Sequence, residues 1–343
     1  MKVLSLFDGI SCGRIALQRA GIPVEIYYAS EIDKYAMEIV RNNFPDTIQL
    51  GDCTKIDFSE YAGKVDLIIG GSPCQGFSFA GKQLNFNDPR SKLFFEFVRA
   101  VREINPTYFL LENVKMKKEY QDIISEQLGV EPIEINSALV SAQNRKRLYW
   151  TNIPNITQPE DKGILLKDIV HEYSDKVEPA WLSKYIVPFD QTLQILDKEV
   201  AKGKVGYFRK DSQANRIYYI HDKGVTLCGD AGGGAAKMGQ YLFGCITPDR
   251  VEKRQNGQRF NDGTKFYTLT AQDRHGVLVE GYIRKLTPIE CERLQTLPDG
   301  YTAGVSDSQR YKCLGNGWTA DVIAHILKNI PTEERKTNET DIS

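Results

Sequence analysis

Short apolar runs alternate with amphipathic stretches through the first 150 residues of the chain. The apolar runs predict strands over residues 2–7, 25–30, 47–50, 65–71, 107–113 and 145–153. Apolar residues at helical spacing predict helices between them, over residues 13–21, 33–44 and 92–104. This alternation is typical of a doubly wound α/β fold, in which helices cover both faces of a mostly parallel sheet.

The alternation stops between about residue 160 and residue 280. Few helices are predicted there, while glycine, tyrosine and basic residues accumulate. Helical patterns return after Thr287-Pro288, which has the composition of a helix start, and over 314–330, where a Gly-Asn-Gly turn precedes an apolar helical face. The final segment, 331–343, is polar and is predicted to be disordered.

Composition and cysteine content narrow the class of protein. The chain has 343 residues, of which 41% are hydrophobic and 26% charged, as in ordinary globular proteins. No apolar run approaches the ~20 residues of a membrane helix, and the N-terminus lacks a signal-peptide pattern. The seven cysteines include no Cys-x-x-Cys pair, which disfavours a disulfide framework and a zinc site. We therefore expect a cytoplasmic protein without a metal.

The net charge of −1 conceals a basic region. Residues 201–285 contain 15 Lys or Arg and 8 Asp or Glu, together with 13 of the 28 glycines. A basic, glycine-rich region beside a near-neutral remainder is typical of a surface that contacts phosphates. A merely solvated loop region has the same composition, so charge alone leaves both interpretations open.

Polar residues follow each of the first five predicted strands. In chain order they are the turn Phe7-Asp8-Gly9 with Gly13, then Glu31, Asp52, Pro73-Cys74 and Glu112-Asn113. Ligands of doubly wound sheets bind at the carboxyl ends of the strands. The sequence therefore predicts one ligand site, built from all five strand ends.

The first three strand ends favour a nucleoside-type cofactor. A carboxylate about twenty residues after a glycine turn commonly binds ribose hydroxyls, and Glu31 follows Gly9 at that distance. The turn does not have the Gly-x-Gly-x-x-Gly pattern of dinucleotide sites. Since the surrounding residues are acidic, a cationic cofactor without phosphates, such as S-adenosylmethionine, fits better than a dinucleotide.

The next two strand ends favour chemistry on a ring. Cys74 and Glu112 can face one substrate, because thiolate attack and protonation of the attacked ring are complementary roles. Arg145 and Arg147 lie two residues apart on a predicted strand, so they are expected to point to one face and to grip an anion together. Taken singly, the cysteine can equally be a buried structural residue and the arginines ordinary solvated ones.

Several segments of the chain, in this order, resemble those of DNA cytosine-5 methyltransferases. They are FDGISCG (7–13), Glu31 in SEID, Asp52 in GDC, GGSPCQGFS (70–78), LFFEFVRAVREINPTYFLLENV (93–114), QNRKRLY (143–149), LTPIECERLQTLP (286–298) and GNGWT (315–319). The resemblance spans residues 3–330 except for the middle region and the tail. It implies a Rossmann-like methyltransferase sheet with an inserted, smaller target-recognition domain.

The resemblance also implies a division of the chain. Because the C-terminal motif carries a cofactor residue, residues 1–160 and 283–330 would form the catalytic and cofactor-binding domain. Residues 161–282 would form the target-recognition domain that binds double-stranded DNA. Its expected DNA contacts, with two from the loop after Cys74, are Gln75, Ser78, Arg209, Lys210, Arg216, Lys237, Arg250, Lys253, Arg254 and Arg259.

The family's chemistry can be assigned to residues of this chain. The resemblance implies that Cys74 adds to C6 of a flipped-out cytosine, that Glu112 holds N3, and that Arg145 and Arg147 position the base and the acid. Residues 75–92 would form a loop that closes over the base. The residues expected at S-adenosylmethionine are Phe7, Asp8, Gly9, Gly13, Glu31, Ile32, Asp52, Cys53, Pro73, Leu93, Asn316 and Trp318.

Two departures from the common bacterial pattern occur at the cofactor motifs. Ser11-Cys12 and the bulky Trp318 stand where small or aliphatic residues are usual, and both resemble the animal de novo branch of the family. We expect them to alter the packing around the methionine end of the cofactor without abolishing binding.

Three other functions remain open from the sequence. They are a transfer-RNA cytosine methyltransferase, a catalytically silent DNA-binding protein and, more distantly, a nucleotide-dependent oxidoreductase. We expect a monomer from a prokaryote or phage, associated with the nucleoid. The sequence leaves open whether a cognate restriction endonuclease is a second partner.

Overall fold

The structure is a computed structural model of the 343-residue chain. It describes residues 1–73, 89–169 and 283–331, and between 169 and 283 only the short segments 186–187, 193–200, 204–208, 216–219, 224–225 and 241–243. Cys74 and most of the predicted DNA contacts therefore lie outside the described residues, as does the predicted tail beyond residue 331.

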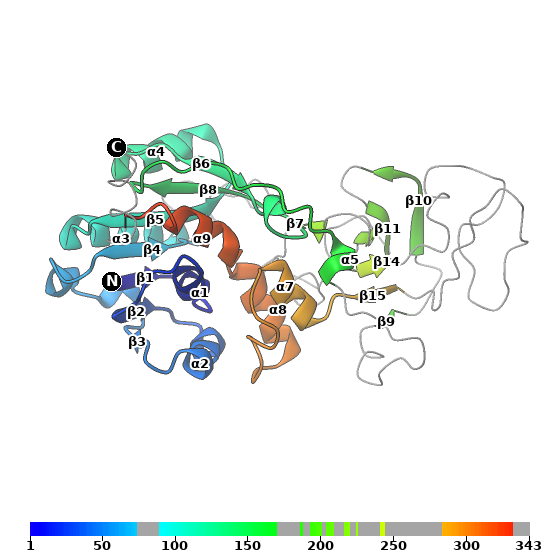
Figure 1. Cartoon of the computed structure of the whole chain (residues 1–343), viewed down its shortest axis with the longest axis horizontal. Coiled ribbons are helices and arrows are strands. Elements are labelled where there is room, and N and C mark those ends of the chain that lie inside the picture. The colour runs from blue at the N-terminus through cyan, green and yellow to red at the C-terminus, as the bar shows by residue number, and fades with distance from the viewer. Residues whose placement is uncertain are drawn as a thin grey trace, which may run out of the picture.

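A seven-stranded sheet in the order β3-β2-β1-β4-β5-β8-β6 forms the centre of the fold (Figure 1). Its strands are β1 (Lys2–Leu6), β2 (Ile26–Ser30), β3 (Ile48–Gln49), β4 (Leu67–Gly70), β5 (Tyr108–Val114), β6 (Ile133–Asn136) and β8 (Lys146–Thr151). The first five strands pair in parallel, and β8 pairs antiparallel with both β5 and β6. The predicted doubly wound, mostly parallel sheet is confirmed.

The strand order reverses at β1. From β1 the chain proceeds outward through β2 and β3, and β4 then returns to the opposite side of β1. The connections that leave β1 and β4 therefore diverge at the carboxyl ends of these two strands, which is where doubly wound sheets bind ligands. The predicted cofactor residues follow β1 and the predicted nucleophile follows β4, so both are expected at this point.

Helices cover both faces of the sheet. The longer ones are α1 (Cys12–Arg19), α2 (Lys34–Asn43), α3 (Pro89–Ile104), α4 (Lys118–Leu128), α7 (Pro288–Leu294), α8 (Asp307–Asn316) and α9 (Ala320–Leu327). On one face, α3 and α4 pack against the sheet in a single apolar cluster that contains Phe97, Ile124 and Leu4. On the other face, α1 and α9 pack side by side.

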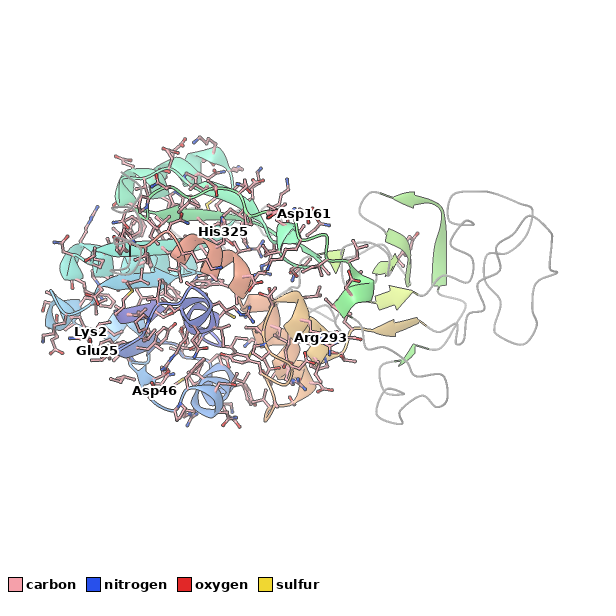
Figure 2. The ribbon with its side chains drawn as sticks, in the orientation of Figure 1. Lys2, Glu25, Asp46, Asp161, Arg293 and His325 are labelled. Atoms are coloured by element: carbon pink, nitrogen blue, oxygen red, sulfur yellow. The ribbon has the colours of Figure 1, made fainter. Side chains whose placement is uncertain are left out.

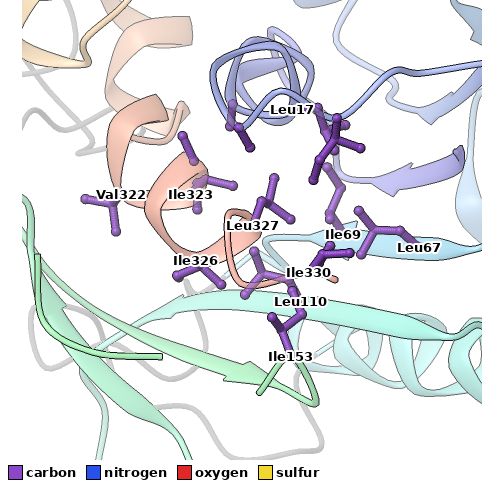
Figure 3. Close-up of a cluster of buried hydrophobic side chains, with 14 of the residues drawn as sticks. Leu17, Leu67, Ile69, Leu110, Ile153, Val322, Ile323, Ile326, Leu327 and Ile330 are labelled. Atoms are coloured by element: carbon purple, nitrogen blue, oxygen red, sulfur yellow. The ribbon is translucent and has the colours of Figure 1, made fainter. Parts of the chain in front are cut away.

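The C-terminal helix α9 completes the core of the first 150 residues. Leu17 of α1, Ile69 of β4, Leu110 of β5 and Leu327 of α9 belong to one buried cluster (Figure 3). Each of these side chains is fully buried, so their contact removes a large apolar area from water. Residues more than 300 positions apart thereby form one core.

Two polar contacts join the segment that follows β8 to α9. His325 Nε2 lies 2.8 Å from the Thr157 carbonyl oxygen, and Lys162 Nζ lies 2.9 Å from Asp321 Oδ2. Figure 2 shows His325 and Asp161 where this segment leaves the large sheet. The chain therefore departs toward its middle region from a defined position beside α9.

Strands of the middle region form a second sheet, in the order β10-β11-β12-β14-β15-β9. These strands are β9 (Ile186–Val187), β10 (Leu193–Val200), β11 (Lys204–Phe208), β12 (Arg216–Tyr219), β14 (Tyr241–Phe243) and β15 (Ile283–Lys285). Figure 1 shows this sheet beyond α5 (Leu166–Ile169), α7 and α8, apart from the seven-stranded sheet. One further strand, β13 (Gly224–Val225), pairs with β7 (Gln143–Asn144), directly before Arg145.

The sequence-based predictions differ from the structure at several elements. Helix α4, strand β6 and most of α8 were not predicted, whereas the Gly-Asn-Gly turn and the helix predicted within 314–330 correspond to the end of α8 and to α9. Gly317 is the C-cap of α8 and separates the two helices. In the part of the chain that the structure describes, no helix is long and apolar enough to span a membrane, and no cluster of potential metal ligands occurs.

Candidate active site

The turn after β1 has an unusual backbone that polar contacts hold in place. Phe7, Gly9 and Ser11 all have positive φ, at 57°, 58° and 55°. The Tyr27 hydroxyl donates to Asp8 Oδ1 at 2.8 Å, and the Ser11 hydroxyl donates to Asp8 Oδ2. Non-glycine residues adopt this conformation only where their surroundings enforce it. Asp8 therefore stabilises the turn.

Burial changes the acidity of Asp8. Loss of hydration raises the pKa of its carboxyl group from 3.8 to about 6, against the lowering effect of the Ser11, Ser5 and Tyr27 hydrogen bonds. The nearby carboxylate of Glu31 adds to the increase. A cation placed beside Asp8 would oppose both effects and favour its ionised form.

Glu31 joins this turn to the end of β2. Its Oε2 accepts from Gly9 N at 2.8 Å, and its Oε1 accepts from Ile32 N at 2.7 Å and Asp33 N at 2.8 Å. The Ile32 side chain is 76% exposed. The space where a side chain at Gly9 would extend is open, with no described atom within 4 Å. Five predicted cofactor residues are thus brought together: Phe7, Asp8, Gly9, Glu31 and Ile32.

The third strand end contributes one exposed and one buried residue. Asp52 caps the short helix η1 (Cys53–Lys55), accepting from Thr54 N at 3.0 Å, and this hydrogen bond lowers the pKa of its carboxyl group. The Cys53 thiol is buried in the α3 side of the core, and burial raises its pKa to about 11. Of these two predicted cofactor residues, only Asp52 presents its side chain to solvent.

Glu112, at the end of β5, forms a nearly buried ion pair with Arg147. Arg147 Nε lies 2.9 Å from Glu112 Oε1, and the two side chains are 12% and 10% exposed. The pair follows from the antiparallel register, in which Val114 faces Arg147 and Glu112 faces Tyr149. Arg147 and Glu112 are therefore diagonal neighbours on one face of the sheet.

Asn113 lies on the opposite face of β5 and holds the end of β4. Its Nδ2 donates to Ser72 Oγ at 3.1 Å, and both residues are buried. Ser72 and Pro73 are the last described residues before Cys74. Asn113, which is next to Glu112, thus holds Ser72 in place two residues before Cys74.

Trp318 lies between the cofactor turn and Glu112. A Cβ atom at Gly71 would be 2.8 Å from Trp318 Nε1 and 3.2 Å from Glu112 Oε2. A Cβ atom at Gly13 would be 3.4 Å from Trp318 Cζ3. The half-buried indole packs on core residues of both neighbouring clusters. Gly71 is therefore required to make room for this ring, whereas a side chain at Gly13 would clash with Ile69 Cδ1 and would only touch the indole.

Arg145 and Arg147 reach different partners, although their spacing predicted a shared one. Arg145 lies before β8 and is buried, with its Nη1 3.3 Å from Gly315 O and its Nη2 3.0 Å from Gly317 O. Only Arg147 contacts Glu112 among these described pairs. Arg145 lies between β7, which pairs with β13, and β8, which belongs to the seven-stranded sheet, and the apolar pattern of 145–153 does not reveal this break.

The remaining predicted residues have mixed outcomes. Asn316 is exposed at the end of α8, and Leu93 of α3 is partly buried against the core. Arg216 is the first residue of β12. The others lie outside the described residues: Cys74, Gln75, Ser78, Arg209, Lys210, Lys237, Arg250, Lys253, Arg254 and Arg259.

One buried residue of the site was not singled out from the sequence. Gln295 is fully buried, and its Nε2 donates to Leu314 O at 2.6 Å and to Gly317 O at 3.1 Å. It lies within LTPIECERLQTLP, so the motif marked its region. Gln295 is the C-cap of α7, directly after the predicted apolar helical pattern, and its burial explains its partners, because buried amides are almost always hydrogen-bonded.

These features define a class of protein: an α/β fold with a polar, positive-φ turn at the end of β1 and a nearly buried carboxylate-guanidinium pair at the end of β5. The family described as C-5 cytosine-specific DNA methylase matches residues 1–332. The chain belongs to this family, and its class of enzyme is DNA (cytosine-5) methyltransferase.

Similar proteins cover the chain almost completely. The type II methyltransferase M.HpaII of Haemophilus parainfluenzae is 32% identical over 351 residues, with 95% of this chain and 88% of that protein covered. M.HhaI of Haemophilus parahaemolyticus, also a type II methyltransferase, is 29% identical, with 96% and 94% covered. The orphan methyltransferase M.SPRI of Bacillus phage SPR is 29% identical, with 96% and 97% covered.

Solved structures support the fold. The Entamoeba histolytica methyltransferase EhMeth superposes with a TM-score of 0.68 at 19% identity, covering 96% of this chain and 97% of that one. A mutant of Spodoptera frugiperda DNMT2 superposes with a TM-score of 0.61 at 22% identity, covering 96% and 98%. The predicted Rossmann-like methyltransferase sheet is confirmed.

Proposed function

We propose that the protein transfers a methyl group from S-adenosylmethionine to C5 of a flipped-out cytosine in a specific duplex DNA sequence. The observation that carries this proposal is the nearly buried Glu112–Arg147 pair beside Gly71, three residues before Cys74. This arrangement brings an oriented carboxyl group close to the point where the chain leads into the predicted nucleophile.

The residues at the ends of β1 and β2 fit S-adenosylmethionine. The open space at Gly9, the exposed Ile32 and the Glu31 carboxylate suit a nucleoside, since an apolar surface can cover a base and a carboxylate can accept from ribose hydroxyls. Asp8 and Glu31 suit its positive charge, and Asp52 and Asn316 would bind from either side. When bound, this cofactor supplies a methyl group on a sulfonium.

Cys74, Glu112 and Arg147 form the base half of the site, which activates the target cytosine. The Cys74 thiolate forms a bond to C6 while N3 takes up a proton from solvent, and the Glu112 carboxylate accepts a hydrogen bond from the N3–H group, so that electron density is available at C5. Arg147 orients Glu112 through its ion pair. Once C5 carries the methyl group, a water molecule takes the C5 proton. The electron pair of the C5–H bond then forms the C5–C6 double bond as the C6–S bond breaks, which restores the Cys74 thiolate and the aromatic ring.

The substrate enters as an extruded base. C5 and C6 of cytosine are inaccessible in a stacked duplex, which requires the target base to rotate out of the helix. We assign residues 1–160 and 283–330 to catalysis and cofactor binding, and residues 161–282 to target recognition. The basic composition of 201–285 supports this division, because DNA binding is dominated by contacts to phosphates.

The cellular setting is also a proposal. Relatives named as orphan and as type II methyltransferases from phages and bacteria are equally consistent with an enzyme that has a partner endonuclease and with one that has none. We propose a monomer in the cytoplasm that works on nucleoid DNA.

A mechanism-based trap tests the proposed function. Duplex DNA with 5-fluorocytosine at the target should form a covalent, denaturant-resistant adduct in the presence of S-adenosylmethionine, because fluorine at C5 cannot leave as a proton does. Cys74→Ser should form none. Transfer of labelled methyl groups to duplex DNA and to transfer RNA should be measured side by side. Exclusive activity on transfer RNA would replace this proposal with the alternative that the sequence left open.

A further inference from the structure

The buried guanidinium of Arg145 lies at the C-terminal end of α8. It donates to the carbonyl oxygens of Gly315 and Gly317, at 3.3 and 3.0 Å, and the residue is only 3% exposed. The end of a helix carries partial negative charge on carbonyl groups without helical partners. The carbonyl groups at the end of α8 offset part of the cost of removing the Arg145 guanidinium from water. Arg145 is therefore held at this helix end.

Gln295 contacts the same helix end from a second direction and shares the Gly317 carbonyl oxygen with Arg145. Its Nε2 donates to Leu314 O and Gly317 O, while its Oε1 accepts from the Thr319 hydroxyl at 2.9 Å. Gln295 is fully buried. The side chains of Arg145 and Gln295 therefore hold the segment 314–319 by hydrogen bonds from the protein interior.

The turn itself allows little displacement. A Cβ atom at Gly317 would be 3.2 Å from both Cys12 Sγ and Cys313 O, so the backbone lies directly against the start of α1. On either side of Gly317 are the exposed Asn316 and the half-buried Trp318, which packs on Gly13. The interior contacts thus determine where these two predicted cofactor residues stand.

We propose that Arg145 is a positioning residue of the cofactor half of the site. It acts through the 315–317 turn, which it holds so that Asn316 and Trp318 face the cofactor. Arg147, two residues further on, serves the base half through Glu112. This inference rests on the proposed function, because it takes S-adenosylmethionine as the ligand of the turn.

Binding of S-adenosylhomocysteine without turnover separates the two arginines. Arg145→Gln should weaken this binding, measured by calorimetry, by about tenfold or more, since the turn loses one of its two anchors. It should raise KM for S-adenosylmethionine more than it lowers kcat. Arg147→Gln is the matched variant and should lower kcat and formation of the 5-fluorocytosine adduct, with the dissociation constant of S-adenosylhomocysteine changed less than twofold.

Tryptophan fluorescence supplies a second measurement. Trp318 borders the cofactor turn, whereas Trp150 is fully buried and donates to Ser125 Oγ at 3.0 Å. S-adenosylhomocysteine should change the emission of the unmodified protein, and Trp318→Phe should remove this response. In Arg145→Gln the change should require at least tenfold more ligand, or should differ in amplitude because the indole is displaced.

The outcomes separate this inference from the proposed function. Unchanged S-adenosylhomocysteine binding in Arg145→Gln, together with loss of adduct formation, would overturn the inference and leave the proposed function standing. Failure of the unmodified protein to bind S-adenosylhomocysteine would overturn the proposed function itself. If Arg145→Gln unfolds at the assay temperature, Arg145→Lys is used, because it retains the charge and one hydrogen bond. In Arg145→Lys, an intermediate loss of affinity for S-adenosylhomocysteine would support the inference. An unchanged affinity would contradict it.

Discussion

The two halves of the site hold their charged groups in different ways. In the cofactor half, Glu31 accepts three backbone N–H groups, and Asp8 accepts the hydroxyls of Ser11 and Tyr27. In the base half, among the residues that the structure describes, Glu112 pairs with one charged side chain, that of Arg147. The first half is shaped by the backbone conformation, and the second by one ion pair between neighbouring strands.

This difference predicts different sensitivities. A nearly buried ion pair costs desolvation energy, and removing one partner leaves the other charge uncompensated. Backbone donors cannot be removed by substitution, so the cofactor half should tolerate a change of side-chain charge better than the base half does.

The largest expected effect is that of Glu112→Gln in the base half. The amide retains the size of the side chain but lacks the carboxylate that accepts from the N3–H group, so kcat should fall by about 10²- to 10⁴-fold. Binding of S-adenosylhomocysteine, measured by calorimetry, should change less than twofold. Glu31→Gln is the matched variant in the other half. A larger loss of kcat in Glu31→Gln than in Glu112→Gln would reverse the contrast.

Gly71→Ala tests the point where the two halves meet. The added methyl group would lie 2.8 Å from Trp318 Nε1 and 3.2 Å from Glu112 Oε2. We expect a loss of about 1–3 kcal/mol in the free energy of unfolding, as is usual for overpacking, and impairment of both cofactor binding and kcat. Chemical denaturation and steady-state kinetics provide the measurements.

The smaller side chain of Trp318→Leu provides the control for this clash. In the double variant Gly71→Ala/Trp318→Leu, the added methyl group has room, so its cost in stability should be much smaller than in the single variant. Purely additive losses would show that Trp318 and Gly71 are not in contact.

A smaller, pH-dependent effect is expected from Asp8→Asn. The pKa of Asp8 is about 6 in the folded protein and is taken as 3.8 in the unfolded chain, so the folded state binds its proton more tightly. The stability due to this proton is present at low pH and is lost as the pH rises from about 4 to about 6. Asp8→Asn should not suffer this loss, gaining about 2 kcal/mol over the parent protein between pH 4 and pH 7.

Binding of S-adenosylmethionine should have the opposite pH dependence at Asp8. A bound cation favours ionised Asp8, so the affinity of the parent protein for S-adenosylmethionine should decline below pH 6, and Asp8→Asn should have a flatter profile. Denaturation and calorimetry over this pH range test both statements. A stability difference that does not vary with pH would show that Asp8 is not the group responsible.

The sequence predicted the parallel part of the fold well because its signals are local. Each of the five strands is a short apolar run, and each is followed by a polar residue that the sheet brings to one edge. The residues Phe7, Asp8, Gly9, Glu31 and Ile32 could be predicted together for that reason.

The antiparallel part could not be predicted in the same way. The strand β8 was expected, but its direction and its neighbour β6 depend on tertiary pairing that a single apolar run does not encode. As a result, the sequence left the partners of Arg145 and Arg147 undetermined. Gln295 was missed for a related reason, since its partners at 314 and 317 belong to a different helix.

The central claim is that the protein methylates C5 of cytosine in a specific duplex DNA sequence, with Cys74 as the nucleophile. Bisulfite sequencing tests it directly, using DNA from a host that lacks cytosine-5 methylation of its own and that expresses either the unmodified protein or Cys74→Ser. The account predicts 5-methylcytosine within one short sequence context for the unmodified protein and none for the variant. Equal methylation by Cys74→Ser, or no methylation of DNA by the unmodified protein, would contradict it.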